Sequence, residues 1–109
     1  MSVLSELFGD CPQLKIIECF VENYQDNLYV ADISRMTGVS KMTVMKHVKV
    51  LLEENIIVKA RKAGQVQFYQ LNVDNPKAKI ILLLESYIVK EKLNEVYVQE
   101  KNTKTHKRL

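Results

Sequence analysis

The stretch TGVSKMTVMKHVKVLLEEN, residues 37–55, decides the fold that this sequence predicts. Gly38 can take the left-handed conformation that ends a helix in a sharp turn, and Ser40 is a preferred capping residue for the next helix. Val39 and Val44 occupy the two positions of a hydrophobic staple around that cap. The stretch therefore predicts two helices joined by a tight turn, which is a helix-turn-helix pattern.

The second of these helices has two different faces. At 100° per residue, Val44, Val48 and Leu51 form a narrow apolar stripe that predicts the buried side. The opposite face carries lysines, methionines and a threonine, and these residue types can contact phosphates, base edges and thymine methyl groups. We therefore expect this face to enter a DNA major groove. The contacting residues on the helix would be Ser40, Lys41, Met42, Thr43, Met45, Lys46 and Lys49.

A β-hairpin is predicted directly after this helix. Asn55 is suited to a left-handed helix cap, and IIVKARKAGQVQFYQLN divides into two β-rich arms around KAGQ. The predicted tip is basic and contains glycine. Beside a helix-turn-helix, such a tip is typical of a wing that lies on the DNA backbone or in the minor groove. Its DNA-binding residues would be Arg61, Lys62, Gly64 and Gln65.

The remaining segments read as helices on either side of this unit. Cys11-Pro12 is a helix start, because proline suits the first helical position. The segment VADISRMT, residues 30–37, forms two turns that should bury Val30, Ile33 and Met36. Asn75-Pro76 begins a last helix that is expected to run to about residue 98.

Charge is distributed unevenly along the chain. Residues 33–67 contain seven Lys or Arg against two acids, whereas residues 1–32 contain one Lys against six acids. Clustered positive charge within one structural unit is what binding to a phosphate backbone requires. The basic unit coincides with the predicted helix-turn-helix and hairpin, and this favours double-stranded DNA as the partner.

The last helix carries more apolar surface than a small core needs. The run IILLL, residues 80–84, is apolar all round, and a stripe continues beyond it among charged residues. Regulators that read paired half-sites need two-fold symmetry, so we expect a homodimer on an inverted repeat. Its interface would consist of Leu4, Leu7 and Phe8 of an N-terminal arm with Leu82, Leu83, Val89, Leu93 and Val96.

The length and composition of the chain limit the class of protein it can be. A chain of 109 residues with 47% hydrophobic and 27% charged residues fits a single globular domain. The predicted fold is mainly α with a small β-hairpin. Residues 1–99 would form the domain with its arm and dimerisation helix, and residues 100–109 a basic, disordered tail. The sequence shows neither a signal segment nor a membrane span, so a cytoplasmic protein without membrane contact is expected.

The sequence predicts neither an enzyme nor a metal or cofactor site. Cys11 and Cys19 lack metal-site spacing and are read as packing thiols, and the two histidines are isolated. Two alternatives to a DNA-binding regulator stay open. One is a protein-interaction module that docks through Met42, Met45 and the hairpin. The other is a redox- or ligand-responsive repressor that uses Cys11, because a helix N-terminus lowers the pKa of a thiol.

The run SKMTVMKHVKVLLEENIIVKARKAGQVQFYQLN resembles the winged helix-turn-helix regulators of the ArsR and MarR type. With FGDCP ahead of it and LNVDNPKAK after it, the sequence is similar to small archaeal winged-helix regulators over roughly residues 7–90. The resemblance implies a winged helix with an extended C-terminal helix, DNA binding and dimerisation. Two positions depart from the usual pattern of these regulators. Tyr29 stands where many of them have a Ser or Thr helix cap, and Asn55 stands where glycine is usual. The segment ADISRM lacks the cysteines of ArsR-type metal sensors, and residues 76–98 lack histidine, so the sensor function is not implied.

Overall fold

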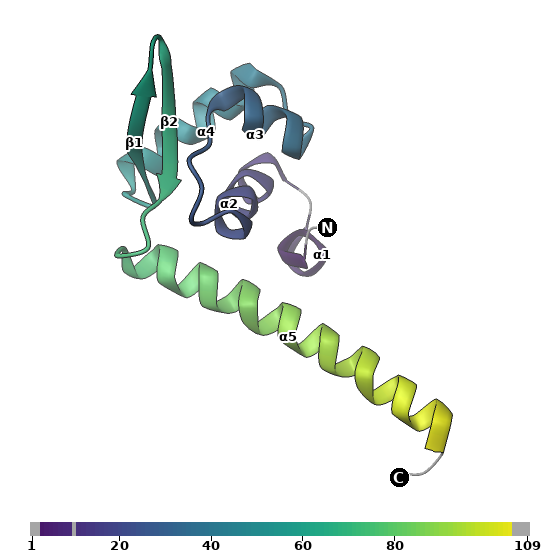
Figure 1. The fold of residues 1–109 in the computed structure, drawn as a ribbon. Coiled ribbons are helices and arrows are strands. Elements are labelled where there is room, and N and C mark those ends of the chain that lie inside the picture. The colour runs from purple at the N-terminus through teal and green to yellow at the C-terminus, as the bar shows by residue number, and fades with distance from the viewer. Residues whose placement is uncertain (1–2, 10, 106–109) are drawn as a thin grey trace.

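The computed structural model describes residues 3–9 and 11–105 of the chain. Within these residues, helices and one hairpin follow each other in an order that matches the prediction of a mainly α chain with a small hairpin (Figure 1). The elements are α1 (Val3–Phe8), α2 (Pro12–Glu22), α3 (Val30–Thr37), α4 (Lys41–Glu53), β1 (Ile57–Ala63), β2 (Val66–Leu71) and α5 (Pro76–Thr105).

The core lies where α2, α3 and α4 meet the base of the hairpin. Phe20 of α2, Ile33 of α3 and Leu51 of α4 are fully buried in it, and each such side chain stabilises the fold by about 1.5–3 kcal/mol. The predicted buried stripe of α4 is confirmed, since Val44 and Val48 also lie in the core. This burial fixes the rotation of α4 about its axis and leaves the opposite face in solvent.

Two expectations about buried side chains were wrong. Met36 was expected in the core, but it is 48% exposed because α3 is short and its last turn extends past the core. Of the two thiols read as packing residues, Cys19 is buried in the middle of α2, whereas Cys11 is exposed. Cys11 precedes the first turn of α2, where no neighbouring element covers it.

The hairpin is joined to the helices at its base. Asn55 has φ 59°, as its capping role predicts, and this left-handed residue turns the chain from α4 into β1. β1 and β2 pair antiparallel, with Ile57 opposite Leu71. Leu28 forms an isolated bridge with this hairpin, in which the backbones of Leu28 and Tyr69 exchange two hydrogen bonds of 2.8 and 2.7 Å.

Helix α5 crosses under α2 and projects beyond the rest of the molecule (Figure 1). Asn75 caps it, with Oδ1 accepting a 2.8 Å bond from the Lys77 backbone N–H. The Lys77 ammonium also pairs with Glu54, which ties the start of α5 to the end of α4. At 1.5 Å per residue its 30 residues span about 45 Å, which explains a longest dimension of 59 Å against 28 and 24 Å.

The end of α5 differs from the expectation. The helix continues to Thr105 instead of ending near residue 98, so residues 100–105, predicted as part of a disordered tail, are helical. The segment NEVYVQEKNTKT contains no glycine or proline to stop the helix. Residues 106–109 of that tail lie outside the described residues. Along the described chain, none of the helices combines the length and apolar character needed to cross a bilayer.

Candidate nucleic-acid interface

The turn between α3 and α4 is fixed by side-chain and backbone hydrogen bonds. Gly38 has φ 76°, and its N–H donates to the Ser34 carbonyl at 2.9 Å. The Ser34 hydroxyl donates to the Val39 carbonyl at 2.6 Å, while the Val39 N–H donates to the Thr37 hydroxyl at 3.2 Å. These bonds satisfy the backbone groups that a helix end leaves without partners. The angle between the two helices is therefore set locally, as the helix-turn-helix prediction requires.

Ser40 caps α4 as predicted. Its hydroxyl oxygen accepts a 3.3 Å bond from the Thr43 N–H, and the hydroxyl donates to Thr43 Oγ1 at 3.0 Å. The Ser40 hydroxyl therefore both accepts and donates a hydrogen bond within the cap. Thr43 is the acceptor in this pair.

The face of α4 opposite the core is open. Met42 is 76% exposed and Met45 is 61% exposed, and the lysines at 41, 46 and 49 are exposed with them. The first turn of α4 contains no acid, whereas Glu53 and Glu54 stand at the far end. The positive end of the helix dipole and the lysines therefore add at the N-terminal half, where an anion binds most favourably.

The hairpin tip projects past α3 and α4, on the side of the molecule away from α5 (Figure 1). Ala63 pairs with Val66, so Gly64 and Gln65 form a two-residue turn, and Gly64 has φ 62°. This turn type favours glycine at its left-handed position. Every predicted contact residue of the hairpin is exposed: Arg61, Lys62, Gly64 and Gln65.

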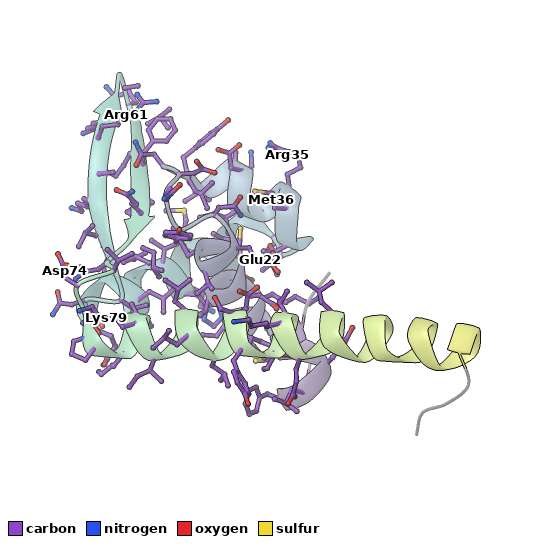
Figure 2. The ribbon with its side chains drawn as sticks, turned by 60° about the horizontal axis from the view of Figure 1, so that its bottom comes forward. Glu22, Arg35, Met36, Arg61, Asp74 and Lys79 are labelled. Atoms are coloured by element: carbon purple, nitrogen blue, oxygen red, sulfur yellow. The ribbon has the colours of Figure 1, made fainter. Side chains whose placement is uncertain are left out.

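A β-bulge sets the direction of Arg61. Lys59 pairs with Tyr69 and Lys62 with Gln67, so two residues of β1, Ala60 and Arg61, face the single residue Phe68 of β2. Arg61 lies near the hairpin tip (Figure 2). Its guanidinium carbon is 4.2 Å from the centre of the Phe68 ring, a cation–π geometry. The charge at the tip is thus held in place by an aromatic ring.

Phe68 also connects the hairpin to the helices. Its ring centre lies 5.2 Å from that of Tyr29, the residue that precedes α3. Tyr29 makes no side-chain capping bond, unlike the residue usual at this position. Its ring makes an aromatic contact with Phe68 instead. Neither role was predicted from the sequence. The only signal available was the pair of adjacent aromatic residues in QFYQL, which does not say which ring supports the arginine.

These positions together form a basic, convex surface over α4 and the hairpin. The predicted contact residues are exposed in it, except for Thr43, which is half-buried. Arg35 of α3 lies near this surface but pairs with Asp32 at 3.0 Å. None of the predicted contact residues lines the hollow between α2 and α3 or the hollow between α2 and α5.

The predicted dimer residues fall into three groups. Leu4 is 1% exposed within one chain, and its N–H donates to Glu18 at 2.8 Å, so its assignment to a dimer interface was wrong. Leu82 is half-buried against the core, and the side chain of Val96 lies outside the described residues. Exposed are Leu7, Phe8, Leu83, Val89 and Leu93.

Helix α5 has a second apolar stripe that was not predicted from the sequence. Ile80, Leu83, Leu84 and Tyr87 follow the spacing i, i+3, i+4, i+7, which puts them on one face of the helix. All four are exposed, and Leu83 is 68% exposed. The sequence could not separate this face from the one that packs on α2, because residues 80–84 are apolar in every direction.

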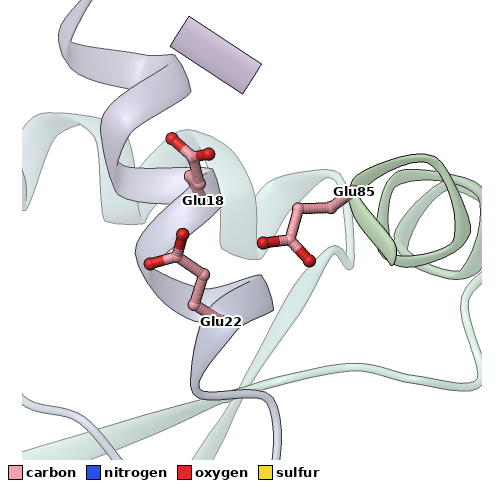
Figure 3. A group of neighbouring side chains, drawn as sticks. All are labelled: Glu18, Glu22 and Glu85. Carbon is pink, nitrogen blue, oxygen red and sulfur yellow. The ribbon is translucent and has the colours of Figure 1, made fainter. Parts of the chain in front are cut away.

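Three carboxyl groups meet between α2 and α5, away from the basic surface. Glu18 and Glu22 of α2 face Glu85 of α5, and their oxygens lie within 4.8 Å of one another (Figure 3). Burial, together with the other carboxylates, raises the pKa of Glu22 and of Glu85. The spacing of Glu18 and Glu22 by one helical turn was visible in the sequence, but the third member comes from a segment 63 residues later than Glu22.

Solved structures of known proteins share the arrangement of α2 to α5. The fold is a winged helix. MepR, described as a transcription regulator of the Staphylococcus aureus multidrug efflux pump MepA, matches with a TM-score of 0.64 at 17% identity, over 94% of this chain and 76% of that chain. The adhesin competence repressor AdcR of Streptococcus pyogenes matches with a TM-score of 0.62 at 18% identity, over 80% of this chain and 63% of that chain.

HlyU of Vibrio cholerae, in its reduced form, matches with a TM-score of 0.55 at 21% identity, over 75% of this chain and 80% of its own. The chain spans less than two thirds of AdcR and of Lactococcus lactis ZitR, 63% and 60% of their lengths. Neither a protein-family model nor a curated protein matches the sequence. Identities this low establish a shared fold, and the function has to be argued from this chain's own surface.

Proposed function

We propose that this protein is a transcription regulator that binds double-stranded DNA in a sequence-specific manner, and that it acts in the cytoplasm as a binding protein rather than an enzyme. One observation carries the proposal. The exposed N-terminal half of α4, with its lysines and without acids, is held at a fixed angle by the Gly38 turn and the Ser40 cap. The names of MepR and AdcR, a transcription regulator and a repressor, agree with it.

In this proposal α4 is the recognition helix. Lys46 and Lys49 lie on its exposed face, where a lysine in the major groove can donate to guanine O6 and N7. Met42 and Met45 present apolar groups suited to thymine methyls. Lys41, at the N-terminus of the helix, lies where the dipole favours a phosphate. The helix therefore combines positioning and base-reading groups.

The hairpin supplies contacts to the adjacent backbone or minor groove. Arg61 is held over Phe68, and Lys62 follows it at the exposed tip. A charge whose side chain is already ordered loses less conformational freedom on binding. The hairpin would thus position the protein without reading many bases. We thus propose that α4 reads bases while the hairpin contacts the backbone. We also propose that the chain is related to ArsR, MarR and small archaeal regulators.

We further propose a homodimer that recognises an inverted repeat. The exposed stripe of α5 with Leu83 and Tyr87, and the exposed Leu7 and Phe8 of α1, are apolar surfaces of the kind that mark protein–protein contacts. Val89 and Leu93 are also exposed, but they lie on the other side of α5, where they line a hollow with Val21 and Tyr24. Two recognition helices related by two-fold symmetry would lie about 34 Å apart, one turn of DNA.

A second function is favoured by one feature of the same surface. Met42 and Met45 are large exposed apolar residues on a helix, and methionines are frequent at adaptable protein-binding surfaces. A winged helix that docks on another protein would use them with the hairpin. The lysines around them favour DNA, because an apolar docking patch depletes charge at its centre.

Selection of bound duplexes from a random DNA pool tests the proposal. The expected result is enrichment of an inverted repeat whose half-sites are about one helical turn apart, with binding that weakens steeply as salt rises. Enrichment of a single half-site would retain DNA binding and refute the dimer. Recovery of an unenriched pool, with equal affinity for all duplexes, would refute a sequence-specific regulator.

A further inference from the structure

A small cavity lies between α2 and α3, on the helix-turn-helix side of the molecule. It has a volume of about 210 Å³, and its lining includes Glu18, Cys19 and Glu22 of α2 and Met36 of α3. Met36 and Glu22 belong to neighbouring elements at its edge (Figure 2). The cavity therefore brings a thiol, a thioether and two carboxyl groups to one place, and the proposed DNA contacts use none of them.

The two sulfur atoms stand at a distance suited to a shared metal ion. Cys19 Sγ lies 3.9 Å from Met36 Sδ, and the two atoms come from different helices, 17 residues apart in sequence. Two sulfur ligands about 2.3 Å from one metal ion lie roughly 3.8–4.0 Å apart in tetrahedral or trigonal coordination. With a third ligand, such as a carboxylate oxygen that lines the same cavity, an ion in trigonal coordination could bind both sulfur atoms at this spacing.

The surroundings select the kind of ion. Thiolate and thioether ligands are soft and prefer Cu(I), whereas Mg²⁺, Ca²⁺ and Mn²⁺ prefer oxygen ligands. Glu18 and Glu22 line the same cavity with Lys15, so two carboxyl groups stand there against one cationic side chain. Met36 is partly exposed, so an ion can reach the pair from solvent, while Cys19 is nearly covered.

We propose that Cys19 Sγ and Met36 Sδ form a binding site for one soft monovalent cation, Cu(I) or Ag(I). On binding, the Cys19 S–H bond breaks, its proton leaves to solvent, and a sulfur–metal bond forms, while Met36 donates a lone pair. The oxidation states of sulfur and metal do not change. The site does not depend on the proposed DNA binding, and it goes beyond the functions considered above.

Without a metal ion, the Cys19 thiol keeps its proton. Burial, and the nearby Glu22 and Asp32 carboxylates, raise the pKa of the Cys19 thiol to about 11. The thiol is therefore protonated at neutral pH and donates to the Met36 thioether. A protonated, buried thiol reacts slowly with alkylating agents and disulfides. Metal affinity should accordingly rise with pH, since one proton must leave for each ion bound.

The chain supplies matched controls for each ligand. Cys11 is a second free thiol, but it is exposed and lies outside the residues that line the cavity. Met45 is a second exposed thioether, on α4, and it also lies outside the lining. Replacing these two residues tests whether binding needs the particular pair or only a thiol and a thioether somewhere in the chain.

The experiment titrates the full chain with Ag(I), and separately with Cu(I) in competition with a chromophoric Cu(I) chelator, under a reductant that contains no thiol. All variants are made in the Cys11→Ser background, so that a single thiol remains. Native mass spectrometry counts the ions bound per chain, and circular dichroism checks that each variant is folded.

We expect one ion per chain in the Cys11→Ser protein and in its Met45→Leu variant, and none in Cys19→Ser. Met36→Leu should lower affinity about tenfold or more while the fold is kept, because Met36 is half-exposed and leucine is similar in size. Should Cys19→Ser fail to fold, Met36→Leu still decides the question. Unchanged affinity in Met36→Leu, or binding retained in folded Cys19→Ser, would overturn the proposal.

Discussion

Removing the two charges at the hairpin tip should change how DNA binding depends on salt. In the proposed complex Arg61 and Lys62 each neutralise one phosphate, and the Arg61 guanidinium is already ordered over Phe68 at 4.2 Å. Each phosphate contact contributes about 0.9 to the slope of log K against log salt. The double variant Arg61→Ala with Lys62→Ala should therefore lower that slope by about 1.8 per chain. Between roughly 50 and 200 mM salt, the ratio of unmodified to variant affinity should shrink about twelvefold per chain.

Two further variants make this prediction specific to the hairpin. Phe68→Leu keeps both charges but removes the ring that orders Arg61, so it should weaken binding by about two- to fivefold without a change in slope. Lys90→Ala removes an exposed charge from α5, away from the hairpin, and should alter neither quantity. Fluorescence anisotropy with a labelled duplex, measured at five or more salt concentrations, gives slope and affinity together. A double variant whose slope equals that of the unmodified chain would show that the hairpin does not touch the DNA backbone.

Three further predictions concern α4, α5 and the carboxyl cluster. Lys46→Ala should relax the preference at one position of each half-site by about 1–3 kcal/mol, measured with a panel of single-base operator variants. Leu83→Glu should yield folded monomers in sedimentation and weaken binding to a full operator far more than to a half-site, because the second half-site is no longer tethered. Glu22→Gln should raise the melting temperature near pH 7 and leave it almost unchanged near pH 4. The folded chain keeps a raised pKa at Glu22, so the stability associated with its proton is present at low pH and is lost as pH rises through that pKa.

Each of these predictions has a result that contradicts it. An unchanged base preference would remove Lys46 from the interface. A Leu83→Glu protein that sediments like the unmodified chain would place the dimer contact elsewhere. For the carboxyl cluster, Glu91→Gln is the control, since Glu91 is exposed on α5 and lies outside the cluster. Equal melting curves for Glu22→Gln and Glu91→Gln across the pH range would show that the cluster does not destabilise the ionised carboxylate of Glu22.

The local parts of this protein were determined by sequence alone. Gly38, Ser40 and Asn55 act through their own backbone conformation or through residues three or four positions away, so their roles could be read from short stretches. The buried stripe of α4 follows from helical periodicity in the same way. The hairpin and its two-residue turn depend on pairing between adjacent arms, which the KAGQ segment already indicates. The helix-turn-helix, the basic face of its second helix and the hairpin are therefore encoded by interactions between residues that are close in the chain.

Only the tertiary structure decided the features that bring distant residues together. The Arg61–Phe68–Tyr29 contacts, the Glu18–Glu22–Glu85 cluster and the Cys19–Met36 pair each join separate elements, and no period in the sequence encodes which side chains meet. The same reason explains Leu4, which packs beside Glu18 instead of facing a partner. In α5 the sequence is apolar all round, so only packing against α2 determines which stripe is left in solvent. Periodicity specifies a face, but the face that is covered depends on where the other elements lie.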